Sequence, residues 1–238
     1  MQGVNMPSVE QTAVPVATLS MVRSPSLAEQ AADAIVTGVS AGALKPGQRL
    51  VEIELANLLN MSRVPLREAL KILEAQGIVE SIPHRGTRIA MFDETRVNQI
   101  CEARVALERI ALSYAAPIYR RSPELLARLD KIITSMERAA DRLEWIQVSK
   151  ADLSFHREIC RASDNSIIET LWDTLARHVF IIFGNEIRDE RDARIMGPQH
   201  RRLRNFLAAG DTAKLHAEIE PHIMRLRRSR KFTKIASL

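Results

Sequence analysis

The chain has 238 residues, of which 46% are hydrophobic and only 4% aromatic, and its formal net charge is +5. This length suits one large or two modest domains, and abundant aliphatic residues with little glycine favour a mainly helical protein. No apolar run approaches the roughly 20 residues that cross a bilayer, and the N-terminus lacks the layout of a signal peptide. We therefore expect a soluble cytoplasmic protein with no membrane contact, and two cysteines exclude a disulfide framework.

Residues 1–24 contain two prolines and no periodic pattern, which predicts a disordered tail. A helix is expected to begin after Ser26, which stands in capping-box spacing with Glu29. The apolar positions predicted for its inner face are Leu27, Ala31, Ala34 and Ile35. A turn at Lys45-Pro46-Gly47 and a short helix around residues 52–59 follow.

The segment of residues 60–77 predicts a helix with an apolar face and a cationic face. Its apolar stripe is formed by Leu66, Ala69, Leu70 and Leu73. On another side Arg63, Arg67 and Lys71 follow one another at four-residue spacing. Ser62 is a candidate N-cap, Pro65 fits the first turn, and Gly77 fits the position just after the last turn. Both ends of the helix are therefore specified locally.

Two short alternating segments, residues 78–82 and 87–91, flank the turn Pro83-His84-Arg85-Gly86 and predict a β-hairpin. Three helices and a two-stranded wing form a winged helix-turn-helix, which we assign to residues 25–91. In such a domain Arg63 and Arg67 would contact base edges, and Ser62 would bind phosphate. Further phosphate or minor-groove contacts are expected from Arg49, His84, Arg85 and Gly86.

The overall positive charge does not support this reading, because residues 26–91 contain equal numbers of basic and acidic side chains. For a single arginine, an ordinary solvated helix face is the simpler interpretation. The combination of cap, stripe, turn and wing favours DNA binding instead. The excess charge lies in a basic run from Arg225 to Lys234, for which a solvated helix end is the preferred explanation over a second nucleic-acid contact.

The motifs Leu44-Lys-Pro-Gly-Gln-Arg-Leu, Met61-Ser-Arg-Val-Pro-Leu-Arg-Glu-Ala-Leu and Arg85-Gly-Thr resemble the DNA-binding domain of GntR-family transcription regulators. The resemblance implies that Arg49, Arg63, Arg67 and the wing glycine contact operator DNA. Some members have another arginine where this chain has Ile53. The operator sequence therefore cannot be carried over from relatives.

Residues 92–238 are expected to form six or seven helices, giving a mainly α fold. Breaks are predicted near Pro117, Pro123, residues 163–165, Gly184, Gly197-Pro198 and Gly210-Asp211. Burying a polar residue on the apolar face of a helix costs free energy unless the residue has a partner, so such positions suggest a binding or pairing role. The informative ones are Asp152 and His156, which are four residues apart, His200, and His222.

One carboxylate and three imidazoles that point inward from three helices suit a divalent transition metal, namely zinc, nickel or manganese. A hydrogen-bonded core is the alternative for each histidine alone. His216 should face outward, and Pro221 is expected to disturb the helix turn that carries His222. The pattern resembles the FCD effector domain of FadR-type GntR regulators. In metal-containing members one Asp and three His hold an ion, which implies this role for Asp152, His156, His200 and His222.

Two further residues are candidates for effector binding. Arg104 lies on the predicted inner stripe of its helix, where it would either bind an effector carboxylate or pair with Glu108 or another acid. His178 lies near the stripe of Ile168, Leu171, Leu175 and Ile182, and core packing is its alternative.

These features together predict a ligand-responsive repressor with no catalytic residues. We expect a homodimer on a pseudopalindromic operator, with a small organic acid bound near the metal. A metal-dependent enzyme fused to a DNA-binding module and a purely structural metal site are the two alternatives.

Overall fold

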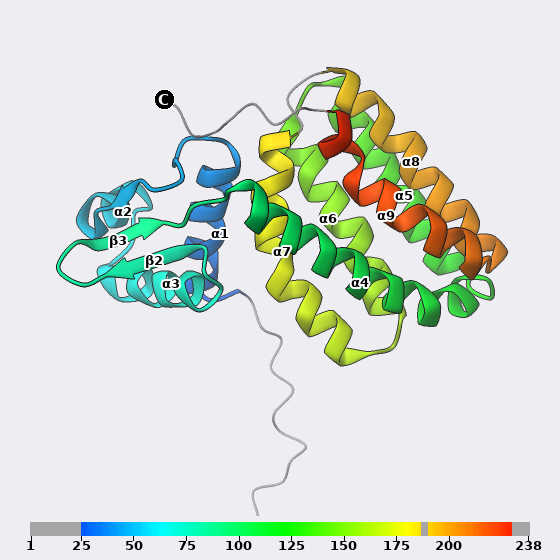
Figure 1. Cartoon of the computed structure of the whole chain (residues 1–238), viewed down its shortest axis with the longest axis horizontal. Coiled ribbons are helices and arrows are strands. Elements are labelled where there is room, and N and C mark those ends of the chain that lie inside the picture. Colours follow the sequence, from blue (N-terminus) through cyan, green and yellow to red (C-terminus); the bar gives the residue numbers. More distant parts are fainter. Residues whose placement is uncertain (1–24, 187–189, 230–238) are drawn as a thin grey trace, which may run out of the picture.

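The computed structural model describes residues 25–186 and 190–229, with side chains omitted at residues 190–194 and 225–229. The predicted tail of residues 1–24 and the side chains of the basic run near the C-terminus lie outside this range. Figure 1 shows a small N-terminal part beside a larger helical bundle. None of the described helices is both long and apolar enough to span a membrane.

The N-terminal part is a winged helix-turn-helix, as predicted. Its elements are α1 (Leu27–Ser40), β1 (Arg49–Leu50), α2 (Glu52–Leu58), α3 (Arg63–Ala75), β2 (Val79–Ile82) and β3 (Gly86–Ile89). The wing contains one more strand than the sequence indicated, because Arg49 pairs with Arg88 and joins β1 to the hairpin. The antiparallel sheet has the order β1-β3-β2.

Helix α3 has the ends that its sequence predicts, with one exception. Ser62 occupies the N-cap position, but its hydroxyl makes no capping hydrogen bond. At the other end Gly77 has a φ of 69°, and the amides of Gly77 and Ile78 donate to the carbonyls of Glu74 and Leu73. This is a Schellman motif, which needs a residue that tolerates positive φ.

Helix α1 begins with the predicted capping box, since the Ser26 hydroxyl accepts from the Glu29 amide and the Glu29 carboxylate accepts from the Ser26 amide. Its predicted inner face was partly wrong, because Leu27 and Ala34 are exposed. The buried residues are Ala28, Ala31, Ala32, Ile35, Val36, Val39 and Ser40. The buried surface differs because α1 packs against α3 and also against helix α7 of the bundle.

The bundle contains six helices within the described residues. They are α4 (Glu94–Tyr119), α5 (Pro123–Asp141), α6 (Trp145–Ala162), α7 (Ser166–Glu186), α8 (Glu190–Ala209) and α9 (Thr212–Ser229). Several predicted breaks are absent, because α4 continues past Pro117, α7 past Gly184, and α8 past Pro198. Pro117 and Pro198 lie on exposed helix faces, where water can satisfy the carbonyls that lose a partner. Helix α9 likewise continues through Pro221.

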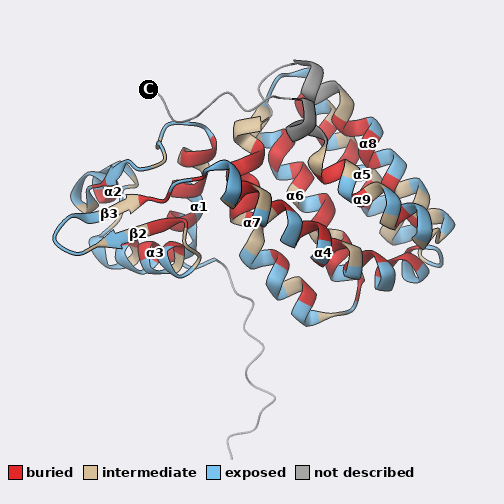
Figure 2. Ribbon diagram, viewed as in Figure 1, coloured by how far each residue is buried: buried red, intermediate tan, exposed pale blue. Residues whose placement is uncertain are grey.

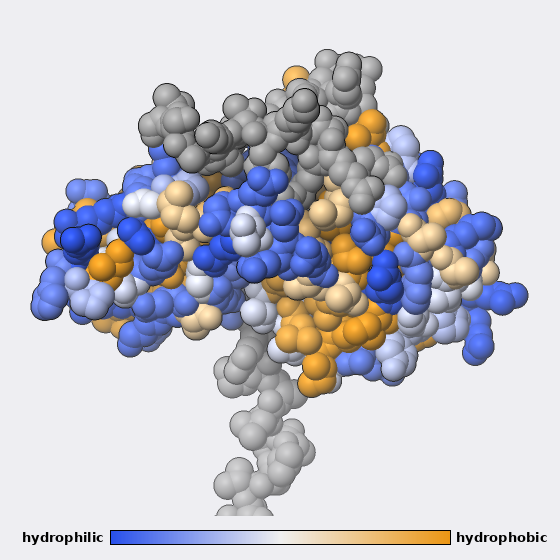
Figure 3. Space-filling model, viewed as in Figure 1, coloured by the Kyte–Doolittle hydropathy of each residue, from blue (hydrophilic) through white to orange (hydrophobic). Residues whose placement is uncertain are grey.

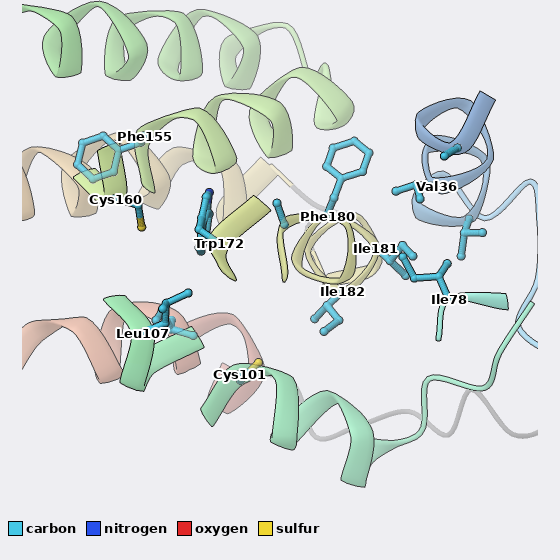
Figure 4. Packing of buried hydrophobic residues seen from close by; sticks show 14 of the residues in the cluster. Val36, Ile78, Cys101, Leu107, Phe155, Cys160, Trp172, Phe180, Ile181 and Ile182 are labelled. Carbon is cyan, nitrogen blue, oxygen red and sulfur yellow. The ribbon is translucent and has the colours of Figure 1, made fainter. Parts of the chain in front are cut away.

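One hydrophobic cluster extends from the winged domain into the bundle. Figure 4 shows Ile181 of α7 between the bundle interior and the side chains of Val36 and Ile78. Figure 2 shows buried residues along the facing sides of the helices, with exposed residues on the outside. The two parts therefore share apolar contacts, and α7 provides much of the junction.

Candidate metal centre and nucleic-acid interface

The exposed face of α3 presents three cations at four-residue spacing: Arg63, Arg67 and Lys71. The opposite face is buried through Leu66, Ala69, Leu70 and Leu73, as the periodicity predicts. The Nε atom of Arg67 lies 2.7 Å from a carboxylate oxygen of Glu52 on α2. This ion pair is largely exposed, so it orients the guanidinium without burying it.

Arg49 and the wing lie together, because β1 pairs with β3. A Cβ atom placed on Gly86 would lie 3.5 Å from the Arg49 Nε, which shows how closely the guanidinium approaches the turn. His84, Arg85 and Gly86 are exposed, and both His84 and Gly86 have positive φ. A non-glycine residue in that region is uncommon and marks a tightly constrained turn. Cations from β1, α3 and the wing therefore belong to one small domain at the end of the molecule away from the bundle (Figure 1).

Four buried side chains of the bundle bring metal-ligating atoms together: Asp152 and His156 of α6, His200 of α8, and His222 of α9. The Asp152 Oδ1 lies 3.0 Å from the His200 Nε2 and 3.6 Å from the His156 Nε2. The Nε2 atoms of His156 and His222 are 3.2 Å apart. All four donor atoms lie within 4.8 Å of one another.

Three of the donor separations, 3.0, 3.2 and 3.6 Å, are close to the spacing of ligands around a single ion. Ligand bonds of about 2.0–2.1 Å at tetrahedral angles place neighbouring donors roughly 3.4 Å apart. The Nε2 atoms of His156 and His222 are within hydrogen-bond distance of each other, and both could instead turn their lone pairs to a shared ion. Histidine and carboxylate donors suit zinc, nickel and manganese, and the residues present therefore fit a divalent ion.

Outer groups fix the orientation of these side chains. The His200 Nδ1 lies 2.8 Å from the Met196 carbonyl, and donation to this carbonyl would orient the ring with Nε2 toward the cluster. The His156 Nδ1 lies 2.5 Å from a Glu108 oxygen on α4. A carboxylate behind a ligating imidazole is a common support for metal ligands. The sequence suggested Glu108 only as a partner of Arg104, and its place behind His156 was missed.

Arg104 of α4 connects the two carboxylates. Its Nε is 2.6 Å from Glu108, and its Nη2 is 3.4 Å from the Asp152 Oδ2. The structure thus shows the protein-pairing alternative for Arg104, while its side chain also lines a small cavity beside Asp152 and His222. Because the three charged groups are fully buried, each depends on the others for compensation.

The burial and charges of the cluster lower the pKa values of both Asp152 and His222. Burial raises the pKa of Asp152, but His156 and Arg104 outweigh it and hold that pKa well below its usual value. Burial lowers the pKa of His222, and the neighbouring imidazoles lower it further. Asp152 is therefore a carboxylate and His222 a neutral imidazole, the forms that bind a metal.

The structure does not bring His178 to this cluster. Its ring lies against Phe92, with ring centroids 6.3 Å apart, and burial with the nearby Arg96 lowers its pKa. This position lies at the junction of α7 with the winged domain, where the ring packs against Phe92 and away from the metal-ligating atoms. Gln199, which the sequence did not single out, instead lines the cavity beside His222. The sequence offered one indication of this role, namely that Gln199 directly precedes the predicted metal ligand His200.

Comparisons with known proteins agree with this architecture. Residues 27–89 match the family described as bacterial regulatory proteins, gntR family, and residues 99–225 match the FCD domain. The chain is 30% identical to a probable D-xylose utilization operon transcriptional repressor of Paenarthrobacter nicotinovorans, over 87% of this chain and 90% of the relative. It is 26% identical to the HTH-type transcriptional regulator LutR of Bacillus subtilis, over 76% and 91%. The structure of E. coli McbR/YncC has a similar fold, with a TM-score of 0.72 at 22% identity, covering 86% of this chain and 98% of that one.

Proposed function

We infer the mechanism of this chain from one premise: it belongs to the gntR family of bacterial regulatory proteins and carries an FCD domain, so it is a transcription regulator and not an enzyme. We propose that it represses transcription by binding operator DNA through its winged domain, and that a small carboxylic acid bound near a divalent metal in the bundle changes this affinity. The similarity to a repressor over most of both chains supports repression.

At the operator, Arg63 and Arg67 read base edges in the major groove, with Arg bidentate to guanine as the commonest specific contact. Ser62, whose hydroxyl makes no capping bond, and Arg49 contact phosphates. His84, Arg85 and Gly86 place the wing against the backbone or the minor groove. The exposure of these residues supports the roles, which mutation of each residue can test.

In the bundle, Asp152, His156, His200 and His222 hold the ion, and Glu108 and Arg104 orient them. The convergence of these four donors beside a cavity is the observation that supports the proposal most strongly. A divalent ion supplies a positive charge that attracts and orients a carboxylate. Arg104, which lines the same cavity, adds a second cation to that wall.

Helix α7 connects this site to the DNA-binding domain. Phe183 lines the cavity, and the adjacent Gly184 lies against α1 so closely that a Cβ there would be 1.8 Å from the Ser40 hydroxyl. The Ser40 hydroxyl donates to the Phe180 carbonyl at 3.0 Å. Three residues further back, Arg177 bonds to Asp33 of α1 and Gln76 at the end of α3. A ligand that displaces Phe183 therefore moves a helix that touches both α1 and α3.

Substituting Gly184 with alanine is expected to weaken operator binding by about tenfold or more, because the added methyl forces α7 away from α1 as an overpacked contact does. Fluorescence anisotropy with labelled operator measures the change. Adding Ser40→Ala to this variant removes the hydroxyl that the new Cβ meets first, so part of the affinity should return. If Gly184→Ala binds the operator as the wild type does, α7 does not transmit the signal.

A homodimer is part of the proposal, because two recognition helices match the two half-sites of a pseudopalindrome. Helix α4 exposes Ile110, Tyr114 and Ile118 at four-residue spacing, and α7 exposes Ile167 and Leu171. Figure 3 shows apolar surface where Figure 1 places this part of α4 and α7. An apolar stripe that crosses two neighbouring helices supports a second copy of the chain as its partner.

Replacing Tyr114 with aspartate is expected to convert the dimer to a monomer of 26.8 kDa, because it places a charge in the centre of the apolar stripe. Light scattering after size exclusion measures the mass, and circular dichroism checks the fold, which should survive because Tyr114 is 55% exposed. The matched control is Ser135→Asp on the exposed face of α5, which should stay dimeric. A Tyr114→Asp protein of dimeric mass places the interface elsewhere.

Selection of DNA duplexes from a random pool by the metal-loaded full-length chain tests the proposed function as a whole. The expected product is an inverted repeat that is released when a small carboxylic acid is added. Selected sites without two-fold symmetry would contradict the dimer. Release that requires no metal would contradict the role of the centre.

A further inference from the structure

Val64 is an exposed apolar residue in the first turn of α3, and its side chain points away from the winged domain. The residue is 67% exposed. The apolar residues that fix the rotation of the helix, Leu66, Ala69, Leu70 and Leu73, are at most 6% exposed. At about 100° per residue, Val64 lies almost directly opposite the mean direction of these four. No other residue of the first turn points so directly outward.

Local stability does not explain a valine at this position. Single exposed apolar residues are common on protein surfaces and need no partner. Valine, however, loses side-chain freedom in a helix, and alanine, glutamate or lysine would form an exposed first turn more readily. Val64 also lies along the chain between Arg63 and Arg67. An apolar residue among cations suits a partner that carries negative charge around an apolar group.

The two arginines leave Val64 open to solvent. The Arg67 Nε lies 2.7 Å from a carboxylate oxygen of Glu52, so this guanidinium is held on the side of α3 that faces α2. Arg63 lies roughly 100° round the helix from Val64. The valine is therefore the apolar centre of an exposed surface with cations beside it.

The chemistry of the DNA major groove limits what Val64 can contact. A valine side chain has no donor or acceptor, so it cannot bond to a phosphate or to the polar edge of a base. Among the four bases only thymine presents an apolar group in the major groove, its C5 methyl. The phosphates on either side of the groove complement the neighbouring cations. Shape, charge and polarity therefore favour the thymine methyl.

Resting on the operator binding proposed above, we propose that Val64 is a specificity-determining residue that packs against the methyl group of one thymine in each half-site. Val64 directly follows Arg63, so this thymine belongs to a base pair next to the one that Arg63 contacts. The arginine selects its base by hydrogen bonds, and the valine selects the neighbouring base by an apolar contact.

Replacing single thymines of the selected operator with deoxyuridine tests this contact, because the change removes the methyl and keeps every hydrogen-bonding group of the base. Fluorescence anisotropy with the full-length chain should identify one thymine in each half-site that is sensitive to the replacement. Its loss should weaken binding about fourfold per half-site, the effect expected for burial of one methyl group.

Val64→Ser and Val64→Thr are matched variants, because both carry a hydroxyl and only threonine keeps a methyl beside it. Both should fold, since the position is exposed. Val64→Thr should still discriminate between thymine and deoxyuridine at the sensitive position, and Val64→Ser should bind the two operators equally. Arg63→Ala should bind both more weakly and keep the fourfold ratio, because it removes a contact to a different base.

A selected operator without thymine in its half-sites would overturn the proposal. Equal affinity of the wild type for thymine and deoxyuridine at every position would also overturn it, as would full discrimination by Val64→Ser. In each of these cases an operator is still bound, so the proposed function survives. If no duplex is selected from the random pool, the proposed function fails together with this inference.

Discussion

Replacing His200 with alanine is expected to abolish metal binding and with it the response to acid, while operator binding in the absence of acid persists. His200 contacts Asp152 within the donor set and is fixed from behind by the Met196 carbonyl. Loss of groups that merely support a metal ligand lowers affinity about 10- to 100-fold, so loss of a ligand should lower it further. Elemental analysis of the reconstituted protein measures the ion content.

Thermal unfolding provides a second measurement of the loss of metal binding in His200→Ala. A metal at about 100 times its dissociation constant stabilises the folded state by roughly 3 kcal/mol, which corresponds to roughly 5–10 °C for a chain of this size. Wild type should gain this shift, and His200→Ala should not. The matched control is His216→Ala, because His216 lies outside the cluster and bonds to Ser113 at 2.8 Å. If His200→Ala binds as much metal as the wild type does, His200 is not a metal ligand.

Replacing Arg63 with alanine is expected to produce the reverse pattern. The side chain is exposed at the first position of α3, so its loss should leave the fold intact and remove one base contact. Such contacts contribute about 1–3 kcal/mol, which lowers operator affinity roughly 5- to 150-fold. Anisotropy against the selected operator and a scrambled duplex measures both affinity and specificity.

Arg138→Ala on α5 is the matched control for Arg63→Ala, since it removes an equally exposed arginine far along the chain from α3. It should retain operator affinity, and both variants should take up metal as the wild type does. If Arg63→Ala keeps full operator affinity and specificity, the recognition role of α3 must rest on other residues.

The winged domain could be predicted in detail because its signals are local. The capping box at Ser26, the glycine after α3 and the apolar stripe through Leu73 each depend on residues within a few positions of one another. The third strand was missed because Arg49 pairs with Arg88, a contact across 39 positions that no short pattern reveals. The inner face of α1 was partly wrong for a similar reason, since α7 covers a second side of it.

The donor set of the bundle was visible in the sequence because inward polar residues contrast with the apolar stripes. The roles around it were harder to predict. Glu108 reaches His156 from another helix, and Arg104 reaches Asp152 from 48 positions away, so only the packing of α4 against α6 identifies them. His178 shared the periodicity of a buried residue, but periodicity does not indicate which neighbour covers it. Predicted helix breaks at Pro117 and Pro198 are absent because both prolines lie on exposed helix faces, where water can satisfy the freed carbonyls.

The most direct test of the account is the operator affinity of one full-length preparation, measured with and without each of a panel of small carboxylic acids, first loaded with a divalent metal and then stripped of it. The account predicts that at least one of these acids changes the affinity of the loaded protein and leaves that of the stripped protein unchanged. An identical response in both forms, or operator affinity that no acid alters in the loaded form, would contradict the coupling of the metal centre to the recognition helix.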